Sequence, residues 1–170
     1  MKKNKIIVFS IVVIFFVFVV ILYKLFPLQY TKEISTVARE YDVDPKLIAA
    51  VVRVESSFRV EAHSSRNAIG LMQITPDTGR WIASKMKVDF READLLDPLT
   101  NLRFGTWFLR YLMDRFNKMD DALKAYNAGI YAITSNRTLS AETVKYVHKV
   151  KEVYIIYKIL YPFWEMHSVR

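Results

Sequence analysis

The most prominent hydrophobic feature of the chain is a continuous apolar run near its N-terminus. Residues 6–23 read IIVFSIVVIFFVFVVILY, in which Ser10 is the one clearly polar side chain before the closing tyrosine. A helix of this length spans about 27 Å, close to the roughly 30 Å hydrocarbon core of a bilayer. Lys24 follows, where a lysine can extend its ammonium group to the headgroups. The pattern predicts one transmembrane helix within residues 1–27 and a separate domain over residues 28–170.

The flanking charges predict the orientation of this helix. Lysines precede the apolar run at positions 2, 3 and 5, and cytoplasmic flanks of membrane helices are enriched in Lys and Arg. We therefore expect a single-pass protein of the cytoplasmic membrane, with the N-terminus inside and the domain outside. A cleaved signal peptide is one alternative, but it needs a shorter apolar region and a small-residue cleavage site, which KLFPLQYTKE lacks. A buried core helix is the other alternative.

The remaining chain shows helical spacing and helix punctuation, and no convincing strand alternation. Three dipeptides pair an N-cap residue with a proline suited to the first helical turn: Asp44-Pro45, Thr75-Pro76 and Asp97-Pro98. Ser140 opens a last helix with Glu142 in its first turn. The expected helices span residues 31–41, 45–55, 76–86, 98–116 and 120–126, with the last from Ser140 onward. We predict an all-α domain on which the aromatic tail, YIIYKILYPFWEMHSVR, packs. The alternative is that this tail lies against the membrane, since Tyr, Trp and Lys favour interfaces.

Composition and charge exclude several classes of function. The 170-residue chain has no cysteine, which rules out disulfide scaffolds, thiol nucleophiles and Cys-ligated metals. Its histidines, at positions 63, 148 and 167, lack ligand spacing, so we expect no metal and no cofactor. Four of the basic residues behind the net charge of +8 lie within residues 1–24, which leaves 21 basic and 17 acidic residues. This mildly basic domain shows no basic stripe, so no nucleic acid is expected as partner.

Glu55 is the side chain whose position suggests chemistry. It lies seven residues after Ile48, on the apolar face of the predicted helix 45–55 and near the negative end of the helix dipole. Partial burial and the dipole both disfavour the carboxylate and raise its pKa, as a general acid requires. The alternative is a structural carboxylate paired with Arg53 or Arg59.

Four short motifs follow in a fixed order: ESSF (55–58), GLMQITP (70–76), AYNAG (125–129) and ETVKYV (142–147). Together they resemble the lytic transglycosylases with a soluble-lytic-transglycosylase (SLT) domain, which share a goose-type-lysozyme-like fold, over roughly residues 32–155. The resemblance implies cleavage of the β-1,4 bond between N-acetylmuramic acid and N-acetylglucosamine in peptidoglycan, without water, to leave a 1,6-anhydro end. Peptidoglycan lies outside the cytoplasmic membrane, where the flanking charges independently place the domain.

The resemblance also implies roles for individual residues. Glu55 matches the single catalytic glutamate, which acts first as acid and then as base, while the substrate's own N-acetyl group stabilises C1. Matching positions expected to contact the substrate are Ser64, Met72, Gln73, Tyr126, Asn127 and Tyr146. Core packing or loop bonding is the alternative role for each of these. The nearby acids, Asp42, Asp44, Glu61 and Asp77, are expected to be surface or capping residues.

The sequence departs from the family pattern at two places. Asn67 stands where the pattern has a glycine before GLMQ, and asparagine tolerates the left-handed backbone region. Ile130-Tyr131-Ala132 replaces the Pro-Gly that follows AYNAG in many relatives. Two alternative functions stay open: a hydrolytic muramidase, and a glycan-binding tether without catalysis. Peptidoglycan strands and the membrane are the expected partners, and no protein partner is indicated.

Overall fold

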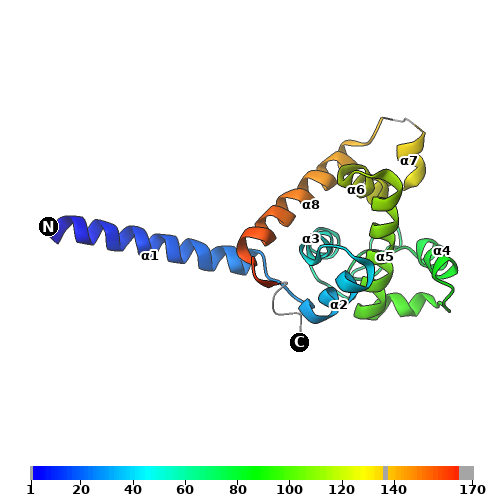
Figure 1. Cartoon of the computed structure of the whole chain (residues 1–170), viewed down its shortest axis with the longest axis horizontal. Coiled ribbons are helices and arrows are strands. Elements are labelled where there is room, and N and C mark those ends of the chain that lie inside the picture. The colour runs from blue at the N-terminus through cyan, green and yellow to red at the C-terminus, as the bar shows by residue number, and fades with distance from the viewer. Residues whose placement is uncertain (1, 136–137, 165–170) are drawn as a thin grey trace.

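The computed structural model describes residues 2–135 and 138–164 and is mainly helical there (Figure 1). Its helices are α1 (Lys2–Leu25), α2 (Thr31–Tyr41), α3 (Pro45–Glu55), α4 (Pro76–Met86), η1 (Glu92–Leu96), α5 (Pro98–Phe116), α6 (Met119–Ala128), α7 (Ile130–Thr134) and α8 (Ala141–Leu160). Within these ranges β-structure is limited to isolated bridges, which join Ile69 to His63 and to Ile74. The predicted order, one apolar helix followed by an all-α domain, is confirmed.

The helices begin at the predicted caps. Asp44, Thr75 and Ser140 each accept a hydrogen bond from a backbone N–H two or three residues later. Asp97 does the same at the start of α5. The sequence pattern does not predict η1 and α7, because elements of five residues are too short to show a hydrophobic period.

The N-terminal helix stands apart from the domain (Figure 1). Residues 5–25 form a stretch of 21 residues that is long and apolar enough to cross a membrane, and none of its most apolar window is buried inside the protein. A core helix would be mostly buried, so the interpretation of α1 as part of the core is wrong. Its role as a retained anchor stays a prediction.

The core of the domain surrounds α3. Its residues from Leu47 to Val52 are all buried, and the helix contacts both α2 and the long α8. On another side of the domain, α5 packs against α2, α4 and α6. Because α3 is enclosed in this way, Glu55 at its last position emerges at the edge of the core.

The aromatic C-terminal segment packs on the domain, as predicted, over the part that the structure describes. Tyr157 and Leu160 are buried, and Tyr161 and Trp164 pack against the core while partly exposed. Residues 165–170 of the same tail lie outside the described residues.

The GLMQ segment is fixed by α5. Met72 is completely buried, and a Cβ added to Gly105 would lie 2.4 Å from Met72 Sδ and 2.6 Å from Met72 Cβ. Asn101 accepts a 2.7 Å hydrogen bond from the Met72 amide. It also donates at 2.9 Å to the carbonyls of Ile69 and Leu95. Both the backbone and the side chain of this segment are therefore held from α5.

We expect Gly105→Ala to lower the free energy of unfolding by about 1–3 kcal/mol through overpacking. Met72 Cβ is fixed to the backbone, so a side-chain rotation cannot relieve the contact. The clash should outweigh the helix-propensity gain of about 1 kcal/mol. Ser84→Ala, at an exposed position of α4, is the control that adds helix propensity without a clash. Urea unfolding followed by circular dichroism measures both, and unchanged stability of Gly105→Ala would contradict the close packing.

Candidate active site

The end of α3 turns sharply and leaves Glu55 at the edge of the core. The buried Ser56 donates its hydroxyl to the carbonyl of Val52 at 3.2 Å. Ser57 and Phe58 then take positive φ angles of 53° and 64°, a region that non-glycine residues seldom adopt. Burial of the Phe58 ring holds this turn in place. The ESSF motif is thus a device that ends the helix directly after the carboxylate.

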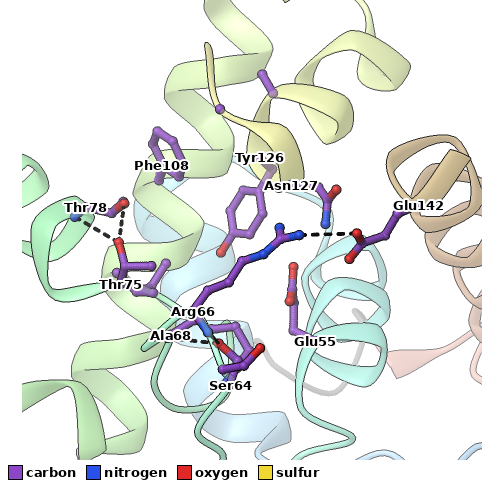
Figure 2. Close-up of a pocket in the computed structure, with 15 residues that line it drawn as sticks. Glu55, Ser64, Arg66, Ala68, Thr75, Thr78, Phe108, Tyr126, Asn127 and Glu142 are labelled. Carbon is purple, nitrogen blue, oxygen red and sulfur yellow. Dashed lines mark hydrogen bonds and ion pairs between the residues drawn. The ribbon is translucent and has the colours of Figure 1, made fainter. Parts of the chain in front are cut away.

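Glu55 lies in an open cleft of about 370 Å³. Its walls come from the end of α3, the loop between α3 and α4, the start of α4, α5, the end of α6 and the start of α8 (Figure 2). Of the seven predicted site residues, five line this cleft: Glu55, Ser64, Gln73, Tyr126 and Asn127. The structure therefore brings most of the predicted site together from three separate sequence motifs.

Burial raises the pKa of Glu55 from its ordinary value of 4.5 to about 7. Loss of hydration disfavours the anion, and the neighbouring Tyr146 hydroxyl offsets part of this effect. Within the described residues no cation forms an ion pair with Glu55. Arg53 donates to the carbonyl of Leu25 at 3.1 Å and Arg59 to that of Ser56 at 3.1 Å, so the interpretation of Glu55 as an ion-paired structural residue is wrong.

Tyr146 is close to Glu55 but is not among the residues that line the cleft. Its side chain is buried, and its hydroxyl completes no hydrogen bond of ordinary geometry within the described residues. Its proximity to Glu55 nevertheless lowers the pKa of that carboxyl, while burial and the charge of Glu55 raise the pKa of Tyr146. The position fits a residue that adjusts the acidity of Glu55 rather than one that touches substrate.

We expect Tyr146→Phe to move the alkaline limb of a kcat/KM profile that depends on protonated Glu55 to higher pH. The hydroxyl lowers the pKa of Glu55, so its removal lets that pKa rise further above about 7 and keeps the acid protonated to higher pH. A purely structural role would lower the rate and leave the pH profile unmoved. Tyr41→Phe, whose hydroxyl donates to Glu40, is the matched control.

Tyr126 and Asn127 of the AYNAG motif face the cleft from the end of α6 (Figure 2). The Tyr126 hydroxyl donates to the carbonyl of Met72 at 2.9 Å, which leaves the ring as its cleft-facing part. Asn127 accepts a 3.0 Å hydrogen bond from Thr143 through Oδ1. This contact orients the amide. Its NH₂ group can then donate to hydrogen-bond acceptors in the cleft, such as a sugar hydroxyl or an N-acetyl carbonyl.

Ser64 and Gln73 line the opposite wall and are each fixed by the loop. Ser64 Oγ accepts from the amides of Arg66 and Ala68 at 3.2 and 3.0 Å, which leaves the hydroxyl proton to donate. Gln73 Nε2 donates to the carbonyls of Ala62 and Gly70 at 3.0 Å each, which leaves Oε1 as an acceptor. Each side chain is therefore held by the loop and keeps one polar group available in the cleft, the hydroxyl proton of Ser64 and the Oε1 acceptor of Gln73.

The backbone has positive φ angles at Asn67, one of the two departures from the family pattern, and at the glycines of the GLMQITP and AYNAG motifs. Asn67 adopts a φ of 58°, so asparagine does take the left-handed conformation expected in place of glycine. Gly70 has a φ of 81°, and a Cβ there would lie 2.2 Å from Asn101 Nδ2. Gly129 has a φ of 85° and is followed directly by the short α7, which begins at Ile130.

The prediction that Met72 packs beside the substrate is wrong. Its side chain is completely buried against α5 and accepts a 3.8 Å contact from the Thr106 hydroxyl at sulfur. Successive side chains of the motif point in different directions: Gln73 faces the cleft, whereas Met72 faces Gly105. Met72 supports the site through its carbonyl, which holds Tyr126.

The cleft also contains two charged residues that sequence reasoning did not assign to the site, Arg66 and Glu142. They form an exposed ion pair with 3.3 Å between Nη2 and Oε2. Figure 2 shows the Arg66 side chain extending across the cleft toward Glu142. Glu142 could have been found from the sequence, because it opens the ETVKYV motif. Arg66 lies 76 residues away, and no local sequence pattern links it to Glu142.

The other acids near the motifs have the structural roles that were expected. Asp44 caps α3, and Asp77 pairs with Arg80 on the surface. Asp42 and Glu61 are exposed. None of these four lines the cleft.

Comparison with known proteins identifies the family. Residues 33–148 match the model of the Transglycosylase SLT domain. The chain is 32% identical over 123 residues to the transglycosylase of Enterobacteria phage PRD1, covering 72% of this chain and 42% of that protein. It is 35% identical over 116 residues to membrane-bound lytic murein transglycosylase C of Actinobacillus pleuropneumoniae serotype 5b, covering 62% and 32%.

Solved structures agree with the sequence matches. The 70 kDa soluble lytic transglycosylase of Escherichia coli superposes with a TM-score of 0.74 at 27% identity, over 81% of this chain and 25% of that one. The chain thus spans less than half the length of these relatives. The expected lysozyme-like fold is confirmed by this similarity. With the matched region covering most of the domain, the chain belongs to the Transglycosylase SLT domain family.

Proposed function

We propose that this protein is a peptidoglycan lytic transglycosylase with Glu55 as its single acid and base. The observation that carries the proposal is a carboxyl group at the end of α3 whose pKa is raised to about 7 and which has no cationic partner among the described residues. A group that titrates near neutral pH can both give and take a proton there. The curated relatives named as lytic murein transglycosylases support the substrate class.

The reaction follows from the groups around the cleft. Protonated Glu55 donates its proton to the glycosidic oxygen as the bond to C1 of N-acetylmuramic acid breaks, and the substrate's N-acetyl oxygen stabilises the cationic C1. The resulting carboxylate takes the proton of the C6 hydroxyl, whose oxygen bonds to C1 and closes the 1,6-anhydro ring. An attached nucleophile has a large effective concentration relative to water. The proton returns to Glu55, so the cycle needs no other reagent.

The second carboxylate in the described cleft lining, Glu142, is poorly suited to a two-carboxylate mechanism. Glycosidases of that type place an acid and a nucleophile or base on either side of the bond. Glu142 is exposed and paired with Arg66. We infer that the pair positions substrate at the rim, while Asn127, Ser64 and Gln73 hydrogen-bond the sugars and Tyr126 packs on them.

We further propose that α1 anchors the domain outside the cytoplasmic membrane. The length and apolar composition of α1 support a span, and the lysines at positions 2, 3 and 5 support an N-terminus inside. Relatives named as membrane-bound support membrane association. We expect the full chain to stay in membranes after alkaline carbonate extraction. We also expect protease added to spheroplasts to digest the domain.

Digestion of purified peptidoglycan by the full chain in detergent, followed by mass analysis of the muropeptides, tests the reaction. Products one water lighter than the hydrolysed sugars are expected. Products of full hydrolysed mass would make the protein a muramidase. Binding to peptidoglycan without any product would instead indicate a glycan-binding tether.

A further inference from the structure

The C-terminal end of α8 is joined to the C-terminal end of α1 by hydrogen bonds from tyrosines. Tyr23 of α1 donates to the carbonyl of Leu160 at 2.7 Å. In the other direction, Tyr161 donates to the carbonyl of Phe26 at 2.9 Å and Tyr157 to that of Pro27 at 3.1 Å. The rings of Tyr23 and Tyr161 also meet edge to face, with centroids 5.4 Å apart. These contacts bind the domain to the end of α1 at a defined position (Figure 1).

Large apolar side chains are exposed around this junction. Ile159 is 71% exposed and Phe163 is 63% exposed. Ile155, one turn before Ile159 in α8, is 56% exposed. Exposed apolar residues that gather next to one another mark an interaction surface, whereas scattered ones need no explanation.

Two of these residues, Ile159 and Phe163, border a hollow of about 600 Å³. It is lined from the α1 side by Tyr23 and Leu28, and from the α8 side by Ile159, Tyr161, Phe163 and Trp164, with Thr31 and further residues completing it. We call Tyr23, Leu28, Ile155, Ile159, Phe163 and Trp164 the apolar collar.

We propose that the apolar collar is a lipid-binding surface, which lies in the outer leaflet and takes phospholipid acyl chains into its hollow. The collar is continuous with α1, whose last residues must lie at the membrane surface if α1 spans the bilayer. Tyr and Trp prefer that depth, because the ring sits among the upper acyl chains while the polar edge meets the headgroups. The inference rests on the proposed anchoring by α1.

The charges beside the collar suit phospholipid headgroups. Lys24 ends α1, and Lys158 extends from α8 with its ammonium 5.3 Å from the centre of the Tyr154 ring. Each lysine can reach phosphate from its long apolar stem. The collar therefore combines an apolar floor with a cationic edge, as membrane-surface segments do.

Quenching of tryptophan fluorescence by lipid tests the proposal. The full chain is reconstituted into vesicles of phosphatidylethanolamine and phosphatidylglycerol, with or without phosphatidylcholine brominated on its acyl chains. One protein keeps only Trp164, through Trp81→Phe and Trp107→Phe. The matched control keeps only Trp81, which lies on α4. Bromine is expected to quench Trp164 several-fold more strongly than Trp81.

Three further variants, each with a single substitution, keep the test independent of the paired substitutions. In the chain with all tryptophans, Trp164→Phe should remove most of the quenching. Ile159→Glu should also weaken the quenching. Val88→Glu should not, because Val88 is an apolar residue that is 46% exposed but distant from the collar. Equal quenching of Trp164 and Trp81 would overturn the proposal and indicate that protein, either residues 165–170 or a second copy, covers the collar.

Failure of the inference can be told apart from failure of the proposed function. Release of the full chain by alkaline carbonate would refute the anchoring itself. Retention in the membrane without quenching of Trp164 would refute the collar alone. Cleavage of peptidoglycan is measured separately in detergent, so its loss or presence does not change either result.

Discussion

Replacing Glu55 by glutamine is expected to lower the rate of glycan cleavage by about a thousandfold or more. The amide has nearly the same shape but cannot give a proton to the glycosidic oxygen or take one from the C6 hydroxyl. Because Glu55 has no ion-pair partner among the described residues, the substitution leaves no charge unpaired. Release of soluble muropeptides from purified peptidoglycan, followed by mass analysis, measures the loss, and binding to insoluble peptidoglycan should persist.

Glu61→Gln is the matched control for this experiment. Glu61 is exposed, lies six positions further along the chain and does not line the cleft, so cleavage should remain close to the wild-type rate. Retention of wild-type activity by Glu55→Gln would contradict the acid–base role and require a different group for proton transfer.

The same Glu55→Gln variant should be more stable than the wild-type protein above neutral pH. The pKa of Glu55 is raised from 4.5 to about 7 by folding, so the native state holds this proton more tightly than the unfolded chain. Wild-type stability therefore falls as pH rises through this window, by up to about 3 kcal/mol. Glutamine does not titrate, so the stability difference should be absent at low pH and level off above pH 7. Urea unfolding at several pH values measures it.

Asn101→Ala is expected to have the largest effect on stability, with a loss of about 3 kcal/mol or more. Asn101 is 1% exposed and bonds three backbone groups, the amide of Met72 and the carbonyls of Ile69 and Leu95. Alanine removes the partner of the Met72 amide and of the Leu95 carbonyl, while the Ile69 carbonyl keeps its 3.1 Å bond from the Ile74 amide. Each buried group left unpaired costs about 1–3 kcal/mol. Cleavage should fall as well, because the Met72 carbonyl holds Tyr126.

Gln29→Ala removes an exposed amide and serves as the control, with an expected change within about 0.5 kcal/mol. Thermal and urea unfolding of both variants, followed by circular dichroism, gives the comparison. Similar stability of Asn101→Ala and the wild-type protein would contradict a supporting role for these hydrogen bonds.

Local signals made much of the fold predictable. Asp44 and Ser140 cap helices where the sequence indicated, because a cap needs only its own side chain and the next three residues. Glu55 was recognised by its place on an apolar helix face, and α3 is indeed enclosed by the core. The short η1 and α7 lack enough residues to carry such a signal.

The direction of side chains in irregular loops was less predictable. Met72 and Gln73 are neighbours in one motif, yet one fills the core and the other faces the cleft. That choice depends on Gly105, which leaves the space that Met72 occupies. Likewise Arg66 meets Glu142 only because the fold closes a separation of 76 residues. Tertiary contacts of this kind have no counterpart in local sequence spacing.

Under the proposed anchoring by α1, the length of α8 limits how far from the membrane this protein can work. The helix has 20 residues and is therefore about 30 Å long. Its last turns meet the end of α1, while its first turn contributes Glu142 to the cleft. With the two ends coupled by one helix, the cleft would stand no higher than about 30 Å above the lipid surface. Glycan strands farther from the membrane would be out of reach, which would confine the proposed cleavage to the membrane-proximal part of the wall.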